Sequence, residues 1–213
     1  MISSTILTIA LCAYLLGSIP SAVLVGKSMY GIDVRDHGSM NAGATNVFRV
    51  LGKPAGILVL LLDIFKGATA VNLAYFAEDQ YVDDNLMAFK IGFGVLAVVG
   101  HIYPVFAKFK GGKGVATLLG MVVALDPILA LGCLIMFVLV MLLTNMVSAG
   151  SILTTLSFGI MTYLRYGLTE PVLQIFGIFA VILVLYTHRS NIIRIWKGEE
   201  KKMNLFKKRE QKV

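Results

Sequence analysis

Long apolar runs, separated by shorter polar segments, organise the chain. A helix crosses the hydrocarbon core of a bilayer with about 20 apolar residues, and the short alternating segments of a β-barrel are absent. The pattern therefore predicts an all-α polytopic membrane protein with seven transmembrane helices. The expected spans are residues 3–25, 54–77, 86–107, 114–125, 128–143, 147–164 and 171–187.

The first and the fourth runs differ from the others. We expect the first to be a retained span, because neither a basic n-region nor an A-x-A-like cleavage site marks it as a signal peptide. The fourth is short and ends at Asp126-Pro127. Its limits stay open, since a tilt or flanking loop residues would have to complete the crossing.

Composition and charge agree with a membrane protein. The chain has 213 residues, of which 57% are hydrophobic, and a mean hydropathy of +0.82. The formal net charge is +7, but lysine and arginine crowd the ends of the runs and the C-terminal tail, which is a topology signal and not a nucleic-acid patch. We expect one catalytic domain, residues 1–200, and a basic cytoplasmic tail, residues 201–213. Cys12 and Cys133 lie inside apolar runs without metal or disulfide spacing, so neither a metal nor a cofactor is expected.

The charges of the loops predict the orientation. Lysine and arginine occupy the loop before residue 54, the "KFKGGKG" loop and the tail, whereas "EDQYVDDN" at residues 78–85 carries only acids. Positive loops face the cytoplasm. The N-terminus is therefore expected outside and the C-terminus in the cytoplasm, which requires an odd number of spans.

The first polar motif lies in "DHGSMNAGATNVFRVLGK", residues 36–53. Small residues from Gly38 to Asn46 leave backbone N–H groups open to an anion, and a helix that starts near Thr45 would direct its positive end there. Arg49 adds a fork-shaped cation suited to phosphate. The alternative is a flexible turn ending in an N-cap, with Arg49 reaching towards lipid headgroups. The neutral donors of this motif are Ser39, Asn41, Thr45 and Asn46.

The second motif is "KGGKG", residues 110–114. It is not a Walker A loop, because Gly114 stands where serine or threonine is required. Glycines around Lys113 can still form a phosphate cradle with a point charge. An ordinary positive-inside loop is the alternative.

The third motif is "HRSNIIR", residues 188–194, followed by Gly198 and Glu199. His188 and Asn191 are three residues apart and share one face of a helix. His188 could donate to a hydroxyl or phosphate group or act as a base, although a polar cap at the membrane interface is the commoner role. We expect Glu199 to anchor the segment through an ion pair.

Two charged residues fall inside an apolar run. Asp63 and Lys66 are three apart in the second run, and a mutual pair facing the bundle is the least costly arrangement of such charges. A structural pair is therefore favoured over a proton or ion path. His101, before Pro104, could be catalytic, but a bond at a helix end before the proline is favoured.

Several motifs together resemble a known family. "GSIPSA", "GSMNAGATNVFRVLG", "LLLDIFKG", "GHIYPVFAKFKGGKGVAT" and "HRSNIIRIWKGEE" occur in this order between Gly17 and Glu200. The chain resembles the bacterial acyl-phosphate:glycerol-3-phosphate acyltransferases, integral-membrane enzymes that make lysophosphatidic acid. The resemblance implies seven spans, cytoplasmic motifs and a place in the bacterial cytoplasmic (inner) membrane, with the active site facing the cytoplasm.

The resemblance also implies roles for individual residues. Arg49, Lys113, His188 and Asn191 would bind glycerol 3-phosphate and, with Ser39, form the catalytic set, while Glu199 would hold the third motif in shape. Residues that would bind acyl phosphate are Gly38, Ser39, Asn41, Gly43, Ala44, Thr45, Asn46, Gly111, Gly112 and Gly114.

Two positions depart from the family pattern. Met40 replaces a usual glycine and would crowd the phosphate cradle unless its side chain points elsewhere. Asn145 stands where a basic residue is expected, which leaves the role of Ser148 open.

An acyl phosphate is an activated mixed anhydride, so the enzyme needs no covalent nucleophile. Alignment of the glycerol hydroxyl and cations to offset two phosphates would suffice. The hydroxyl would attack directly, and its proton would pass to a substrate phosphate oxygen or to His188. The H-x-x-x-x-D pair of other acyltransferases is absent.

The expected partners are acyl phosphate, glycerol 3-phosphate and membrane lipids, without nucleic acid or an obligate protein partner. The alternative function is a membrane transporter of an organic phosphate. Short acidic outer loops and the absence of an inverted repeat argue against it. The sequence leaves acyl-chain length and oligomeric state open.

Overall fold

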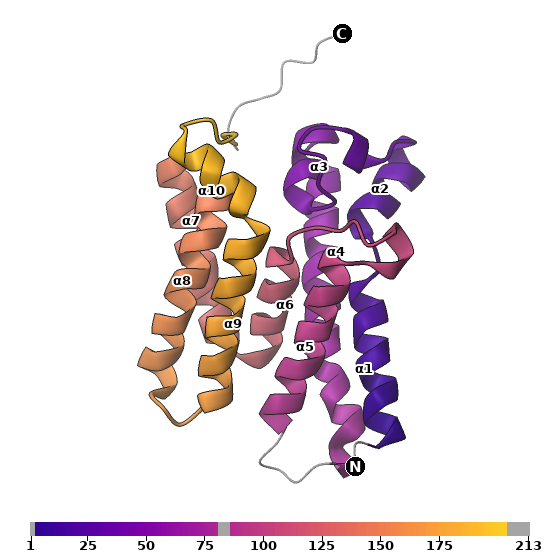
Figure 1. Ribbon diagram of the computed structural model, residues 1–213, viewed down its shortest axis with the longest axis vertical. Helices are drawn as coiled ribbons and strands as arrows, with labels where there is room; N and C mark the ends of the chain where they lie inside the picture. The colour runs from indigo at the N-terminus through magenta and orange to yellow at the C-terminus, as the bar shows by residue number, and fades with distance from the viewer. Residues whose placement is uncertain (1–2, 81–85, 204–213) are drawn as a thin grey trace.

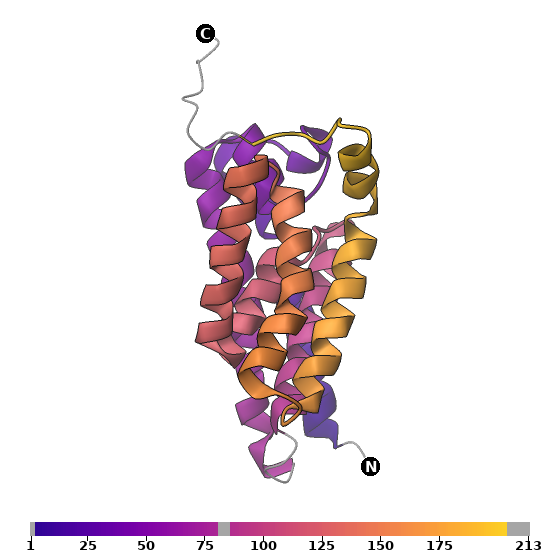
Figure 2. The ribbon, with the colours of Figure 1, turned by 90° about the vertical axis from the view of Figure 1, so that its left-hand side faces the viewer.

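The computed structural model describes residues 3–80 and 86–203, and every regular element among them is helical. The helices form an elongated bundle in which most axes run along its length (Figures 1 and 2). The start of α1 and helix α10 lie at opposite ends of the bundle. Residues 81–85 of the acidic loop and 204–213 of the tail lie outside the described residues.

Short breaks divide the chain into thirteen described elements. In chain order they are α1 (Ser4–Gly17), α2 (Ser21–Tyr30), η1 (Val34–Asp36), α3 (Ala44–Val50), α4 (Lys53–Asn72), η2 (Leu73–Gln80), α5 (Leu86–Ile102), η4 (Val105–Ala107), α6 (Val115–Leu125), α7 (Pro127–Thr144), α8 (Val147–Tyr166), α9 (Pro171–Thr187) and α10 (Arg189–Trp196).

The expected first span is two helices, α1 and α2, that meet at 44°. Pro20 precedes α2 and lacks the N–H that would continue the helix. The polar groups of the break are satisfied from α4: Lys66 Nζ donates to the Ile19 carbonyl at 3.0 Å, and Ser21 Oγ donates to Asp63 Oδ1 at 2.9 Å. The predicted pair is formed, with Lys66 Nζ 2.9 Å from Asp63 Oδ1. It ties the break in the first span to the second.

Helix α6 lies in the middle of the bundle and packs closely on α4 (Figure 1). Glycines allow this approach. A Cβ atom on Gly67 would collide with the backbone of Thr117, and one on Gly120 would collide with the backbone of Ile64. The backbones of α4 and α6 are therefore in direct contact at two positions along the helix pair.

Helices α7, α8 and α9 form a second group beside α6 (Figure 2). Asp126 caps α7 by accepting from the backbone N–H groups of Ile128 and Leu129, and its carboxylate also pairs with Arg165 and Tyr166. Proline at the first position of α7 and of α9 suits these helix starts. The turn between α7 and α8 places Asn145 at a φ of 58°.

The protein is an all-helical, multi-pass membrane protein, as predicted. Within the part of the chain that the structure describes, four helical segments are long and apolar enough to cross a membrane, and the bent pairs α1–α2 and α9–α10 raise the number of candidate spans to six. Helix α6 has eleven residues, about 16 Å of helix, which is shorter than the ~30 Å hydrocarbon core.

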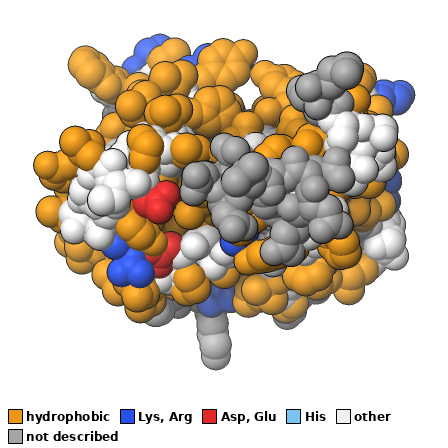
Figure 3. Space-filling view, turned by 90° about the horizontal axis from the view of Figure 1, so that it is seen from below, with side chains coloured by type: hydrophobic (Ala, Val, Ile, Leu, Met, Phe, Trp, Pro, Cys, Tyr) orange, Lys and Arg blue, Asp and Glu red, His pale blue; other side chains and the backbone are white. Residues whose placement is uncertain are grey.

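Large apolar side chains cover the outside of the bundle. Leu143 is 75% exposed and Leu164 is 78% exposed, which is typical of a surface that contacts lipid and not water. Hydrophobic side chains also form most of the rim when the molecule is seen from the end that carries the start of α1 (Figure 3).

Candidate active site

A cavity of about 490 Å³ lies inside the bundle, and its lining includes residues of α3 and α10, which lie at the same end of the bundle (Figure 1). All five residues of the predicted catalytic set line it, although they come from three segments far apart in the sequence: Ser39, Arg49, Lys113, His188 and Asn191. The three polar motifs therefore meet at one site.

The first motif lines the cavity through all of its predicted contacts. Those residues are Gly38, Ser39, Asn41, Gly43, Ala44, Thr45 and Asn46. The side chain of Asn46 is buried and is used inside the loop. Its amide donates to the carbonyls of Val34 and His37, and its oxygen accepts from the backbone and hydroxyl of Ser39. Asn46 thus holds the loop in shape while the other residues form the wall.

The backbone of this loop explains one departure from the family pattern. Met40 has a φ of 57°, in the left-handed region where glycine is unstrained. Its side chain is 74% exposed, so it stands at the rim and does not fill the cradle. Asn145, the other departure, also has positive φ, a conformation that asparagine tolerates.

The glycines of the second motif do not share one role. The Gly111 N–H donates to the Ile102 carbonyl at 3.2 Å, and the Gly112 N–H donates to the His101 carbonyl at 3.1 Å. Neither glycine lines the cavity, and a Cβ on either would collide with His101. These glycines dock the loop on the end of α5. Contrary to expectation, the structure does not bring them to the cavity wall.

Lys113 and Gly114 do reach the cavity. Gly114 has a φ of 84° and caps α6, so the loop turns sharply into the helix and directs its N-terminus at the cavity. Lys113 Nζ donates to the amide oxygen of Asn191. Burial lowers the pKa of Lys113 to about 8; the Glu200 carboxylate opposes this shift, and nearby Arg194 and Arg49 add to it.

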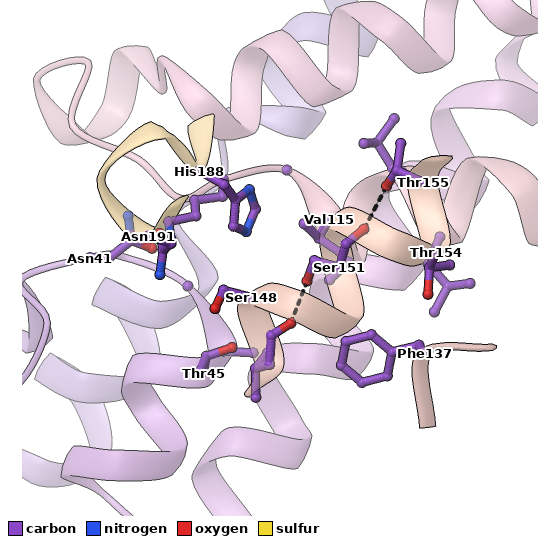
Figure 4. Close-up of a pocket in the computed structure, with 18 of the residues that line it drawn as sticks. Asn41, Thr45, Val115, Phe137, Ser148, Ser151, Thr154, Thr155, His188 and Asn191 are labelled. Carbon is purple, nitrogen blue, oxygen red and sulfur yellow. Dashed lines mark hydrogen bonds between the residues drawn. The ribbon is translucent and has the colours of Figure 1, made fainter. Parts of the chain in front are cut away.

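The third motif lies at the junction of α9 and α10, which meet at 65°. The Nδ1 atom of His188 is 2.9 Å from the Val184 carbonyl. Because a carbonyl only accepts, Nδ1 carries the hydrogen in this bond, which leaves the Nε2 lone pair available on a side chain that lines the cavity. His188 and Asn191 are both buried, and both side chains point into the same space (Figure 4).

A glutamate that the sequence analysis passed over joins these groups. Glu200 accepts from Ser148 Oγ at 2.7 Å, from Asn191 Nδ2 at 2.6 Å and from Arg194 Nε at 2.8 Å. Burial alone raises the pKa of Glu200, but these hydrogen bonds outweigh it and hold the pKa below its usual value. Glu199, the predicted anchor, is exposed. The structure gives the anchoring contacts to Glu200.

The buried pair in α4 reaches the edge of the same cavity. Asp63 lines it together with His101, whose Nδ1 is 3.4 Å from Asp63 Oδ1. Lys66 pairs with the same carboxylate from the side away from the cavity lining. His101 therefore does more than bond at a helix end. Its side chain contacts Asp63, and its carbonyl accepts from the N–H of Gly112 in the second motif.

Helix α8 lines the cavity from its polar end to its apolar end. Ser148, Ser151, Thr155 and Phe158 follow one another at helical spacing along one face. Figure 4 shows the three hydroxyl groups in sequence along α8, with Phe137 of α7 beside them. The Ser151 and Thr155 hydroxyls donate to backbone carbonyls one turn earlier. The wall therefore changes from hydroxyl groups to hydrocarbon with depth.

The open end of the cavity favours anions. The basic side chains that line the cavity are Arg49, Lys113, Arg194 and Lys201; Glu200 lies among them, and Asp63 lines the cavity from α4. The first turns of α6 and α8 also line the cavity, and the N-terminal end of a helix carries partial positive charge and open N–H groups. Phosphate is the anion for which arginine and helix N-termini are well suited.

Comparison with known proteins shows the family to which the chain belongs. A family model described as glycerol-3-phosphate acyltransferase matches residues 7–198. The chain belongs to this family. Relatives named glycerol-3-phosphate acyltransferase include one from Exiguobacterium sibiricum, 46% identical with 95% of this chain and 96% of the relative covered, and one from Chlorobaculum tepidum, 38% identical with 96% and 99% covered.

Solved structures agree with the assignment. The glycerol 3-phosphate form of PlsY (YgiH), an integral membrane glycerol 3-phosphate acyltransferase, matches with a TM-score of 0.83 and 37% identity, covering 96% of this chain and all of that one. Its lysophosphatidic acid form matches with a TM-score of 0.80, covering 94% and 96%. The predicted family and enzyme class, a membrane glycerol-3-phosphate acyltransferase that forms lysophosphatidic acid, are confirmed.

Sequence reasoning missed the parts of this acyltransferase site that no polar motif marks. Besides Glu200, these are Arg194 and Lys201 at the open end, Ser151 and Thr155 on α8, and the apolar wall. The hydroxyl residues of α8 carried a usable signal, since Ser148, Ser151 and Thr155 repeat at helical spacing. The apolar wall carried none, because its side chains do not differ from those that face lipid.

Proposed function

We propose that the chain moves a fatty acyl group from acyl phosphate to a hydroxyl group of glycerol 3-phosphate, releasing phosphate. The observation that carries the proposal is the cavity itself. Its open end holds the predicted catalytic set with its cations, and its depth is hydrocarbon. A substrate with a phosphate head and an acyl tail matches this division.

The reaction needs alignment more than a new reactive group. The glycerol hydroxyl attacks the carbonyl carbon, the bond from that carbon to the phosphate oxygen breaks, and the phosphate leaves with the electron pair. Arg49 and Lys113 offset the charge of two phosphates, and the N-terminus of α6 adds open N–H groups. Holding the hydroxyl beside the carbonyl accounts for much of the rate.

The hydroxyl proton has two acceptors in this site. One is an oxygen of a substrate phosphate, and the other is Nε2 of His188, whose Nδ1 is held by the Val184 carbonyl. His188→Ala turnover at saturating substrates separates them. Full turnover would exclude His188 as the base and leave the phosphate, whereas a fall of about 10²-fold or more fits general base catalysis.

The donor is proposed to be acyl phosphate and not acyl-CoA. Two phosphate groups, one on each substrate, match the several cations at the open end. The test offers purified protein in detergent either long-chain acyl phosphate or the matching acyl-CoA, each with glycerol 3-phosphate, and measures lysophosphatidic acid. Product from acyl phosphate alone supports the proposal. Product from acyl-CoA alone would overturn the donor assignment, and no product from either would overturn the function.

We also propose seven spans, with the N-terminus outside and the active site and C-terminus in the cytoplasm of a bacterium. The basic residues of the motifs and of α10 lie at one end of the bundle, which supports this orientation. Helix α6 would cross as the fourth span, with local thinning of the bilayer matching its eleven residues. One catalytic domain, residues 1–200, and a basic tail, residues 201–213, remain part of the proposal.

A further inference from the structure

The apolar half of the cavity ends at one depth on four helices. The deepest lining residues are Val122 on α6, Cys133 on α7, Phe158 on α8 and Phe176 on α9. Residues one turn further along these helices do not line the cavity. The cavity therefore ends inside the bundle and is not a channel through it.

A tightly packed core closes the pocket behind this level. Leu129 and Ala130 on α7 are each 5% exposed, and Leu173 on α9 is 1% exposed. These residues belong to the same buried cluster as the four deepest lining residues. Lengthening a chain beyond this level would require displacing close-packed side chains, which costs free energy.

The two phenyl rings form the centre of the closed end. Phe158 and Phe176 pack edge to face with ring centroids 5.8 Å apart, and both are almost fully buried. Helices α8 and α9 are close at this level, since a Cβ atom added to Gly177 would lie 3.6 Å from the Gly159 backbone, an ordinary contact. Ala180, one turn above Phe176, is small and leaves the pocket open. Along α9, a large side chain at Phe176 is thus followed one turn later by a small one at Ala180.

The depth of the pocket matches an acyl chain. At about 1.5 Å of rise per residue, Phe158 lies about 15 Å along α8 from Ser148, and Phe176 lies about 18 Å along α9 from His188. Half of the ~30 Å hydrocarbon core is about 15 Å, the distance that one lipid acyl chain spans. A chain whose phosphate lies at the polar end would reach the two rings with its last carbons.

We propose that Phe158 and Phe176 form the stop that sets the upper limit of acyl-chain length in this enzyme. The inference rests on the proposed transfer of an acyl group. Because the chain already lies in hydrocarbon before it binds, each methylene that fits in the apolar pocket raises kcat/KM through close packing against the wall. This gain ends where the chain meets the rings, and Ala180 keeps the space before that point open.

The experiment measures kcat/KM for a series of saturated acyl phosphates at saturating glycerol 3-phosphate. Their chains range from about 12 to about 20 carbons in steps of about two methylenes. Phe176→Ala and Phe158→Ala should move the optimum to longer chains. Ala180→Leu should move it to shorter chains. Phe179→Ala is the matched control, because Phe179 lies on α9, does not line the cavity and is 36% exposed; its profile should equal that of the wild type.

Ratios between chain lengths are taken within one preparation, so partial loss of folded protein does not affect them. Phe176→Leu provides a milder variant in case the alanine variants fail to fold. A wild type that makes no lysophosphatidic acid from any length would overturn the proposed function. A wild type that does, with variants whose profiles keep the same optimum, would overturn the stop alone.

Discussion

At the scale of single residues, Glu200 shapes the polar end of the site. Its carboxylate receives hydrogen bonds from Ser148, Asn191 and Arg194, and Asn191 in turn accepts from Lys113. Three segments of the chain are therefore fixed to one another through one side chain. Since the cations around it repel each other, the same carboxylate also lowers the cost of bringing them together.

Glu200→Gln should lower kcat/KM for glycerol 3-phosphate by about 10- to 100-fold, as expected for the loss of charge-assisted hydrogen bonds of about 1.5–3 kcal/mol. Glu199→Gln removes the same charge one residue earlier, where the side chain is exposed, and should leave kcat/KM unchanged. Steady-state kinetics of both purified variants test the pair. Equal losses in both would contradict the assignment of the anchor to Glu200.

Lys113 predicts an alkaline limit to substrate binding. Burial, opposed by Glu200 and assisted by Arg194 and Arg49, lowers its pKa to about 8, and only the ammonium form attracts phosphate. As pH rises through about 8 the free enzyme loses this charge, so kcat/KM should fall. Bound phosphate favours the ammonium form, so kcat should fall only at higher pH.

Lys113→Arg is the control for this prediction, because a guanidinium stays charged throughout the range. Its kcat/KM, although lower, should lack the fall near pH 8 in profiles measured at constant ionic strength. Glu200→Gln should move the fall to lower pH, since Glu200 raises the pKa of Lys113. A fall that remains in Lys113→Arg would assign it to another group or to decay of the donor.

Residue types and spacing predicted which motifs meet at the site. They did not predict which of the two adjacent glutamates, Glu199 or Glu200, faces the cavity. Gly198, with a φ of 71°, ends α10, and the Glu199 N–H donates back to the Arg194 carbonyl. This turn reverses the chain and points Glu200, not Glu199, into the site. The two glutamates have the same chemistry, so only the three-dimensional turn distinguishes them.

At the scale of elements, the hydrophobic runs predicted the long helices within a few residues. The runs themselves do not show where the first span breaks: Pro20 precedes the second helix there, and Lys66 and Ser21 stabilise the break by bonding across two helices. The short length of α6 was visible in the sequence. Its position in the centre of the bundle was not, because that depends on glycines that face α4.

Gly120→Ala should destabilise the protein by about 1–3 kcal/mol, the usual cost of overpacking, because the added methyl group collides with the backbone of Ile64. Activity should fall as well, since α6 directs its N-terminus at the cavity. Gly92→Ala on α5 is the matched control: no atom lies within 4 Å of its added Cβ, and alanine favours helix by about 0.5–1 kcal/mol. Thermal unfolding in detergent should rank Gly92→Ala above Gly120→Ala, and the reverse order would contradict this account of the contact.

At the scale of the whole molecule, the site exists only because the bundle brings distant segments to one end. Residues 38–49, 113–116, 147–155 and 188–201 all contribute to one cavity. Basic composition identified these segments as lying on one side of a membrane, which is why their meeting could be predicted. The depth of the pocket could not, because it depends on where four helices pack tightly behind it.

Whether α6 crosses the membrane can be tested by finding on which side of the membrane the residues before and after it lie. Between Lys53 and Thr169 the chain passes through α4, α5, α6, α7 and α8. If α6 crosses, these five passages put Lys53 and Thr169 on opposite sides of the membrane. If it does not, four passages put them on the same side. Lys197, after α9, should lie on the side of Lys53 when α6 crosses.

Single cysteines at these three exposed positions read out the parity, in an active protein in which Cys12 and Cys133 are replaced by alanine. An impermeant maleimide added to intact cells with a permeable outer membrane should label Thr169→Cys, and should label Lys53→Cys and Lys197→Cys only after the inner membrane is opened. This result requires α6 to cross despite its eleven residues, with the bilayer locally thinner around it. If Thr169→Cys, like Lys53→Cys, were labelled only after the inner membrane is opened, the two positions would lie on the same side. Helix α6 would then be a re-entrant helix, and the proposed seven spans would be wrong.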